Sequence, residues 1–492
     1  MQKKTPQTIF FHRQTWVLFF LYTGLRILSF GTFTTPLLQG IIVFIVLMSL
    51  GVLFFKKPAW ALSLVLFELF LGGSGHLFEI GGIAIRSAIL LVFLLLYSIK
   101  AIAGKNTWRQ LSIPHGLFYV TIIMCIYMVY ASINGIRQGN AIIAAIQDLT
   151  PFLFFGLLPP IFHLTKEKKG QEFFLRLCVV STISAAIFAV YNEILFASGH
   201  AIVHDHYYSW FRDVLMGKIT DMHTGFFRIV LPEHLLAIPG LLIPISLILK
   251  KEKHHFLWYS IIFANSITLT LNLSRAYILG ILIGFIPLLY RRNFLRYFVT
   301  IVTVVAVMAL NFFTLHFIAS GGKSFGQNLF FNRAASIVQP KTEKSTYTRT
   351  SLLDPILRKI RQSPIFGSGL GSTITFQPPN SSKMVTTRQF DWGYLEIITE
   401  LGVIGLCIVL LFFAQLIIAL KKSLDHMSDF PGLAVGILAT LIALLFIQIF
   451  APIFTHVLGI FFLVLCSVFV TQKHTPFERI IAHLYRLFHR KA

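Results

Sequence analysis

Apolar runs close to 20 residues long recur along the whole 492-residue chain, separated by short polar connections. A helix of about 20 apolar residues crosses the roughly 30 Å hydrocarbon core of a bilayer. The pattern predicts fourteen membrane-spanning helices, with twelve or thirteen as alternatives because the third and ninth runs are short. The expected spans are residues 15–30, 37–55, 59–72, 83–103, 113–133, 142–164, 172–197, 234–250, 255–271, 274–290, 297–318, 392–420, 431–451 and 454–472.

Composition supports an all-α polytopic membrane protein, because 56% of the residues are hydrophobic and only 12% are charged. A soluble domain carries about twice that charged fraction. All four cysteines fall inside apolar runs without C-x-x-C spacing, so we expect buried thiols rather than disulfides or a zinc site. The basic N-terminus, MQKKTPQTIFFHRQ, precedes an apolar run without a clear cleavage site, which favours a retained first helix.

The net charge of +23 would suit nucleic-acid binding, but the short basic clusters all fall on one side of the predicted topology. The positive-inside rule makes this side the cytoplasm, and an even number of spans places both termini there. The topology divides the chain into six parts. These are an N-terminal bundle (1–197), a first external loop (198–233), central helices (234–318), a large external loop (319–390), C-terminal helices (391–472) and a basic tail (473–492).

The large external loop carries ten basic and two acidic residues, a net charge of +8. The charge fits either a solvated basic surface or a site for an anionic substrate. Arginine favours the second interpretation, because its planar fork matches phosphate oxygens. The basic residues are Lys323, Arg333, Lys341, Lys344, Arg349, Arg358, Lys359, Arg361, Lys383 and Arg388, and the acidic ones are Glu343 and Asp354.

Several ionisable residues lie inside or at the edge of the predicted spans. A charge at the bilayer centre costs roughly 2.5–3.5 kcal/mol on insertion scales, so such residues usually face a partner or a cavity. Together they predict a polar chamber open to the external side, although Arg26 could instead snorkel to the membrane surface. These residues are Arg26, Glu68, Arg86, Asp148, Glu193, Arg275, Glu396 and Glu400.

Three external segments have internal patterns. Ser274 is a candidate N-cap, which puts Arg275 at the mouth of a helix whose dipole opposes its charge, so an anionic partner is expected. An apolar stripe from Leu352 to Ile360 predicts an amphipathic helix that lies on the membrane or caps the chamber. The glycines at 367, 369 and 371 then predict a flexible turn that could form an anion-binding nest.

The stretch HAIVHDHYYSWFRD, in the first external loop, allows two interpretations. His204, Asp205 and His206 could hold a metal, although their spacing fits no standard zinc pattern. The neighbouring aromatic residues suit an interfacial segment or a sugar-stacking surface better.

The stretch RQFDWGYLEIITELGVIGL places three acids at a membrane entrance. Asp391 precedes the predicted helix, and Glu396 and Glu400 lie near the positive end of its dipole. The two glutamates share one helix face at i, i+4, which leads us to expect that they are structural partners of arginines such as Arg275.

Three segments in this order resemble the O-antigen ligase/polymerase superfamily: LSRAYILG, RTSLLDPILRKIRQSPIFGSGLG and DWGYLEIITELGVIGL. They cover roughly residues 260–420. The resemblance implies a GT-C-like fold of about fourteen helices with a large, mostly helical periplasmic loop. It also implies a metal-independent, inverting glycosyltransferase of the bacterial inner membrane that needs no cofactor. The donor would be a glycan on undecaprenyl diphosphate, and the acceptor would be lipid A-core or a growing glycan.

Carried over to this chain, the resemblance implies that Arg275 and Arg349 bind the diphosphate and that Asp391 is catalytic or orients the acceptor. We also predict that Arg388 binds the diphosphate. Ligases usually carry His at the position of Asp391, so the aspartate favours a polymerase, and a carboxylate can still act as a base. Supporting residues would be Arg358, which stands in an R-x₁₀-G spacing with Gly369, together with Tyr394, Glu396 and Glu400.

Other functions stay open beside polymerase. An O-antigen ligase and a protein O-glycosylation ligase would use the same donor. A transporter or flippase of lipid-linked glycans is the main rival class, but such proteins usually show repeated halves and short loops.

Overall fold

The computed structural model describes residues 12–71, 75–81, 83–103, 113–223, 225–250, 255–289, 294–338, 344–378, 383–388, 390–426 and 431–471. The expected basic tail (473–492), the N-terminal residues 1–11 and part of the basic clusters, including Lys341, lie outside these ranges.

Each expected span has a helical counterpart. The segment expected at 142–164 is divided into α7 (Ile142–Leu149), the 3₁₀ helix η2 (Thr150–Leu157) and α8 (Leu158–Lys166), where prolines interrupt the α-helical hydrogen bonds. The other counterparts are α2 (Arg13–Thr32), α3 (Pro36–Lys56), α4 (Pro58–Leu71), α5 (Ile85–Ala103), α6 (His115–Arg137), α9 (Lys168–Ala197), α11 (Ala237–Leu249), α12 (His255–Asn272), α13 (Arg275–Leu288), α14 (Phe294–Ala319), α17 (Gly393–His426), α18 (Pro431–Ile447) and α19 (Val457–Thr471).

The chain is a multi-pass, mostly helical membrane protein. In its described part, nine helical segments are long and apolar enough to cross a membrane, and four further apolar helices are shorter. The exact count of fourteen spans stays a prediction.

The chain folds into two compact units that are discontinuous in sequence. The first unit comprises Met1–Leu96, Glu167–Ile337 and Asp429–Leu444, and the second comprises Tyr97–Lys166, Val338–Ser428 and Leu445–Ala492. The six-part division expected from membrane topology follows a different criterion and stays a prediction.

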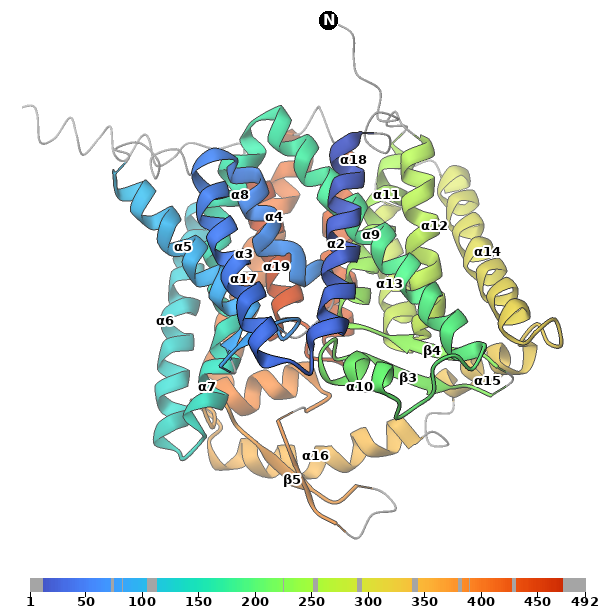
Figure 1. The fold of residues 1–492 in the computed structure, drawn as a ribbon. Coiled ribbons are helices and arrows are strands. Elements are labelled where there is room, and N and C mark those ends of the chain that lie inside the picture. The colour runs from blue at the N-terminus through green and yellow to red at the C-terminus, as the bar shows by residue number, and fades with distance from the viewer. Residues whose placement is uncertain are drawn as a thin grey trace, which may run out of the picture. The chain divides into compact units, whose positions relative to one another are not determined.

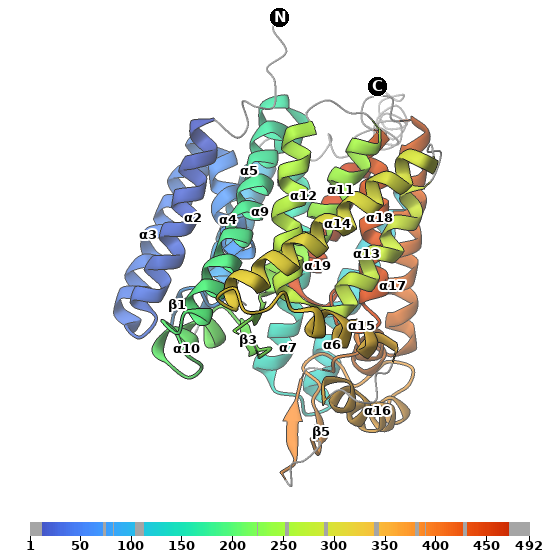
Figure 2. The same ribbon diagram turned by 90° about the vertical axis from the view of Figure 1, so that its right-hand side faces the viewer.

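In the first unit, α12 packs against α9, α11 and α14. Figure 2 shows that α14 crosses this group obliquely, and only 17% of its most apolar window is buried inside the protein. The first external loop contains the short helix α10 (His206–Asp213) and an antiparallel hairpin of β3 (Lys218–Asp221) and β4 (Phe227–Val230). Strand β4 packs on α9 and α12, so the hairpin covers the ends of these helices. A smaller hairpin pairs β1 (Glu79–Ile80) with β2 (Ile83–Ala84).

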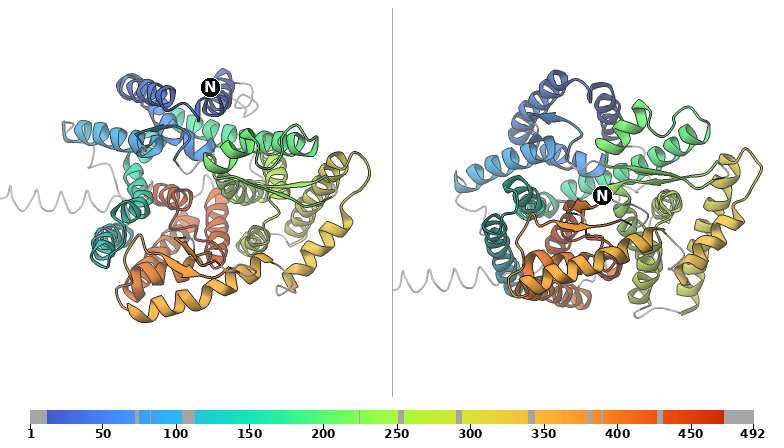
Figure 3. Two further views of the ribbon diagram at one scale, coloured as in Figure 1. Left: turned by 60° about the horizontal axis from the view of Figure 1, so that its bottom comes forward. Right: turned by 90° about the horizontal axis from the view of Figure 1, so that it is seen from below.

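In the second unit, α6 packs along α17, and α19 packs on η2 and α8. The large external loop supplies α16 (Lys344–Gln362) and an antiparallel hairpin of β5 (Ile374–Phe376) and β6 (Val385–Thr387). Figure 1 shows that α16 runs across the end of this unit from which β5 projects, and Figure 3 shows the same arrangement from below. The loop also contributes α15 (Gln327–Val338), most of which belongs to the first unit.

The apolar face of α16 is buried against protein. Leu352 and Ile356 form a core cluster with Ile374 and Phe376 of β5 and with Phe390, just before α17. This helix therefore covers the hairpin and the start of α17, and the alternative in which its buried stripe lies on the membrane surface is wrong. The hairpin itself was not predicted. Its two strands are only three residues long and contain threonines, so the sequence shows no clear alternation of apolar and polar positions.

Candidate functional site

Two residues predicted from distant parts of the sequence meet at the start of α17. Arg349, on α16, lies with its Nε 4.0 Å from Oδ2 of Asp391, and the two side chains are 33% and 46% exposed. Asp391 has a φ of 57°, in the left-handed region that non-glycine residues seldom adopt. Such backbone is kept only where the surroundings fix it, and it is common at functional sites.

Trp392 holds this pair together, a role that the sequence did not reveal. Its Nε1 donates a hydrogen bond of 3.0 Å to the backbone carbonyl of Arg349, which ties α16 to the residue that follows Asp391. On its other side the indole packs near Phe450, with ring centroids 6.4 Å apart. The one feature of the sequence that could have indicated this role of Trp392 is its position between Asp391 and the first residue of α17.

The two glutamates of α17 are buried, with 7% of Glu396 and 5% of Glu400 exposed. The hydroxyl of Thr455 donates to Oε1 of Glu396 at 2.8 Å, so a threonine supplies a contact where an arginine was expected. The backbone of Ser372 bonds to Glu400, and the charge of Arg388 acts on that carboxyl. Arg275, the expected partner, belongs to the first unit.

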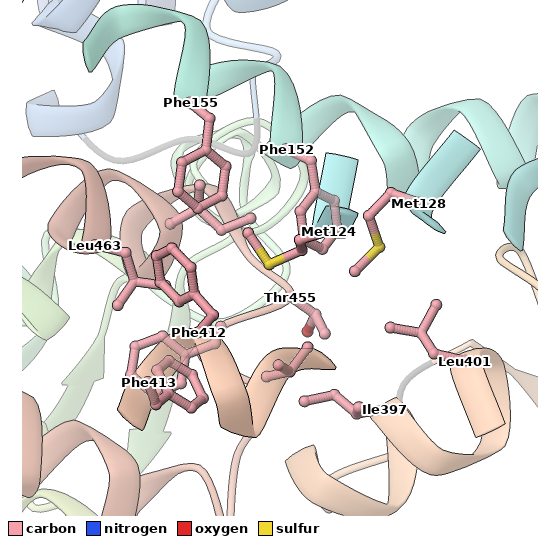
Figure 4. Close-up of a pocket in the computed structure, with 13 residues that line it drawn as sticks. Met124, Met128, Phe152, Phe155, Ile397, Leu401, Phe412, Phe413, Thr455 and Leu463 are labelled. Carbon is pink, nitrogen blue, oxygen red and sulfur yellow. The ribbon is translucent and has the colours of Figure 1, made fainter. Parts of the chain in front are cut away.

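Thr455 also lines an apolar pocket in the second unit, shown in Figure 4. Its walls come from α6, η2, α17 and α19, and Thr455 is the polar exception among the residues that line it. The lining residues are Met124, Met128, Phe152, Phe155, Ile397, Leu401, Val409, Phe412, Phe413, Phe454, Thr455, Ile460 and Leu463.

Arg388 is held by protein groups of α7. Its Nη1 donates to Oε1 of Gln147 at 2.6 Å, its Nη2 donates to the carbonyl of Ala144 at 3.2 Å, and Nη2 also forms an ion pair with Asp148. The diphosphate-binding role of Arg388 stays a prediction. To contact a ligand, the guanidinium would have to break some of these bonds to α7.

The remaining supporting candidates of the second unit make local contacts. Arg358 pairs with Asp354 at 3.0 Å on the exposed side of α16, and the hydroxyl of Tyr394 donates to the carbonyl of Leu445 at 2.9 Å. Lys359 donates to the carbonyl of Thr373 at 2.7 Å. Burial lowers the pKa of Lys359, and the charge of Glu400 acts in the opposite direction.

The glycine-rich turn is a packed element rather than an anion-binding nest. Residues 367–372 are all buried. Their backbone N–H groups are already used: Ser368 donates to Thr399 and Gly369 to Glu400, while Gly371 donates to the carboxylate of Asp148. The predicted flexible nest is therefore wrong, because a turn can offer its N–H groups to an anion only when no carbonyl or carboxylate accepts them.

In the first unit, Arg275 is the first residue of α13, with Ser274 at the N-cap position as expected, although its side chain makes no capping bond. Leu273 joins α12 to this cap with a φ of 48°. Arg228, on β4, donates from Nε to the carbonyl of Asn272 at 2.7 Å. The junction of α12 and α13 thus gathers two arginines at a helix N-terminus, which is an arrangement suited to an anion.

Sequence reasoning missed Arg228. It lies in the first external loop, whose predicted roles rested on its histidines and aromatic residues. No local sequence pattern links Arg228 to Arg275. The pairing of β3 with β4 and the packing of β4 on α12 are what bring it to the junction.

Ionisable residues near the spans of the first unit are paired inside the protein. Arg26 is 4% exposed and forms an ion pair with Glu233 at 3.0 Å, so the alternative in which it snorkels is wrong. Arg86 pairs with Glu68 at 3.3 Å. Glu193 accepts from the backbone N–H of Phe227 at 3.0 Å, which fastens β4 to α9. The external polar chamber itself stays a prediction.

The histidine-rich stretch has structural roles in the first unit. Asp205 caps α10 by accepting from the N–H of Tyr208 at 2.6 Å and from that of Ile202 at 2.9 Å. The ring of His206 packs on Phe33, with centroids 4.7 Å apart. Among the residues that the structure describes, no three His, Cys, Asp or Glu side chains come together as a metal site.

Comparison with known families identifies part of the chain. Residues 260–410 match the family model described as O-Antigen ligase. This range contains Arg275, Arg349, Arg388 and Asp391. No curated protein matches the chain. The matched region extends from α12 into α17, and it supports the predicted resemblance to the O-antigen ligase/polymerase superfamily.

Proposed function

We propose that this protein transfers a glycan from an undecaprenyl-diphosphate-linked donor to an acceptor hydroxyl on the periplasmic side of the bacterial inner membrane. The family match supports a role in surface-glycan assembly. The observation that carries the proposal is the pairing of Arg349 with Asp391 on a strained backbone at the start of α17.

In this mechanism Asp391 accepts the proton of the acceptor hydroxyl. The hydroxyl oxygen forms a bond to the anomeric carbon as the bond from that carbon to the diphosphate oxygen breaks, with inversion. The leaving diphosphate gains negative charge, and fixed arginines aimed at that charge stabilise the transition state. We assign Arg349, which pairs with Asp391 in the second unit, to this task.

A further feature supports the proposed transfer. The side chains of Arg349 and Asp391 are partly exposed, so the pair can reach a substrate.

We favour a polymerase, which joins glycan repeat units to one another, because an aspartate stands where ligases usually carry histidine. The description of the matched family favours the second candidate, a ligase that joins O-antigen to lipid A-core. A deletion strain separates the two. Loss of a polymerase leaves lipid A-core with a single repeat unit, whereas loss of a ligase leaves bare core and lipid-linked polymer.

Complementing that strain tests the enzyme itself. Asp391→Asn keeps the shape of the side chain and removes the base, which should slow transfer by about 10²- to 10⁴-fold. Arg349→Ala should slow it by about 10²- to 10³-fold. Arg212→Ala is the matched control, since this arginine forms an exposed ion pair with Asp213 on α10. Glycan profiles on gels give the readout, and normal glycan length and attachment with Asp391→Asn would refute the proposed transferase.

A further inference from the structure

One carboxylate in the second unit clamps both ends of the β5–β6 hairpin. Asp148, at the end of α7, accepts from the backbone N–H of Gly371 through Oδ2 at 2.9 Å. Its other oxygen, Oδ1, forms the ion pair with Arg388. Gly371 precedes β5 and Arg388 follows β6, so a single side chain fixes the base of the hairpin.

Arg388 is docked on α7 by more than this ion pair. It also donates to Gln147 and to the carbonyl of Ala144, so its two terminal nitrogens are directed at one helical turn. The side chains of Arg388 and Asp148 are 34% and 26% exposed, which limits the screening of their attraction by solvent. The backbone at position 388 is thereby held in a fixed place relative to α7.

This anchor lies three residues before Asp391. Phe390, fully buried in the core cluster, continues the chain from the anchor toward α17. A residue with a φ of 57° keeps that conformation only if the chain is held on both sides. On one side Trp392 and α17 hold it, and on the other side Phe390 and the Arg388–Asp148 pair do.

We propose that Asp148 is a positioning residue for the transfer reaction, acting through Arg388 to set the backbone that carries Asp391. The inference rests on the proposed function and assigns Arg388 to positioning rather than to diphosphate binding. The two assignments predict different kinetics. If Arg388 bound the donor, its loss would raise KM for the donor, and freeing it from Asp148 would leave that KM unchanged or lower it.

The test measures release of undecaprenyl diphosphate from a lipid-linked glycan donor by the purified full-length protein, with envelope lipids of the deletion strain as acceptors. Misplacement of a reacting group by about 1 Å can cost on the order of 100-fold in rate. We therefore expect Asp148→Asn and Arg388→Gln each to lower kcat by about 10- to 100-fold with an unchanged KM for the donor. The double variant should be no slower than the slower single variant, and Arg388→Lys should recover part of the rate.

Controls separate the possible failures. Asp213→Asn removes an exposed ion pair elsewhere and should leave both constants unchanged. A raised KM for the donor in Arg388→Gln, without any effect of Asp148→Asn, would overturn the positioning role. Full activity of Asp391→Asn would instead overturn the proposed function. If Asp148→Asn does not accumulate in membranes, equal kcat values for Arg388→Lys, Arg388→Gln and wild type still reject the inference.

Discussion

The glycine-rich turn offers the sharpest test of how the large loop is built. Gly369 has a φ of 74°, and a Cβ added there would lie 2.1 Å from the backbone nitrogen and 2.2 Å from the Cα of Gly135 on α6. Gly139, in the same unit, has a φ of 89° and no heavy atom within 4 Å of the corresponding position. Gly369→Ala and Gly139→Ala therefore share the backbone penalty and differ in the collision.

The expected magnitudes follow from these contacts. An alanine in the left-handed region costs about 1–2 kcal/mol, and both variants carry this term. Overpacking adds about 1–3 kcal/mol, and only Gly369→Ala carries it. The colliding atoms are backbone atoms of a helix, which cannot rotate away as a side chain can. We expect Gly369→Ala to be less stable than Gly139→Ala by about 1–3 kcal/mol.

Thermal unfolding of the purified protein in detergent measures the difference, with exposure of the buried thiol of Cys466 as the signal. Gly135→Ala is a useful third variant. Alanine normally stabilises a helix relative to glycine by about 1 kcal/mol, yet here its Cβ would lie 2.2 Å from the carbonyl oxygen of Leu370. Equal apparent Tm values for Gly369→Ala and Gly139→Ala, or a stabilised Gly135→Ala, would show that the turn does not pack against α6.

Two further predictions concern paired groups. Arg26→Met leaves Glu233 as a buried carboxylate without its ion-pair partner and should destabilise the protein by about 3–5 kcal/mol. The double variant Arg26→Met/Glu233→Gln should recover part of this loss in the same thermal assay. No recovery would contradict the pairing. Trp392→Phe keeps an aromatic ring but removes the bond to the carbonyl of Arg349. It should cost about 0.5–1.5 kcal/mol of stability. It should also lower the transfer rate of the protein that remains folded, so a wild-type transfer rate would refute a role in holding Arg349 near Asp391.

Helix positions were largely predictable because they depend on local sequence. A run of apolar side chains is favourable in lipid wherever the rest of the chain lies, and every expected span coincides with helix. The amphipathic helix in the large loop was predicted for the same reason, since the stripe from Leu352 to Ile360 is a local periodicity. The two-stranded hairpins were not, because their strands are only two to four residues long.

Roles that depend on contacts between distant segments could not be predicted. The glycines at 367, 369 and 371 suggested a flexible turn, and only the approach of α6, α7 and α17 shows that they allow close packing. Arg26 could have snorkelled, and only the position of Glu233 made it a buried partner. Glu396 and Glu400 were correctly placed on one face of a helix, but their partners lie in loops whose positions no periodicity gives.

By itself, the sequence determined that this is a multi-pass helical membrane protein with a large basic loop, and it singled out Arg349 and Asp391 as residues of interest. The tertiary structure decided that these two meet, that Trp392 and Asp148 fix the backbone around them, and that Arg228 joins the junction at Arg275. The division has a physical reason. Hydrophobicity and helix periodicity act over neighbouring residues, whereas a site is made by a few directional contacts between segments that the chain brings together only when it folds.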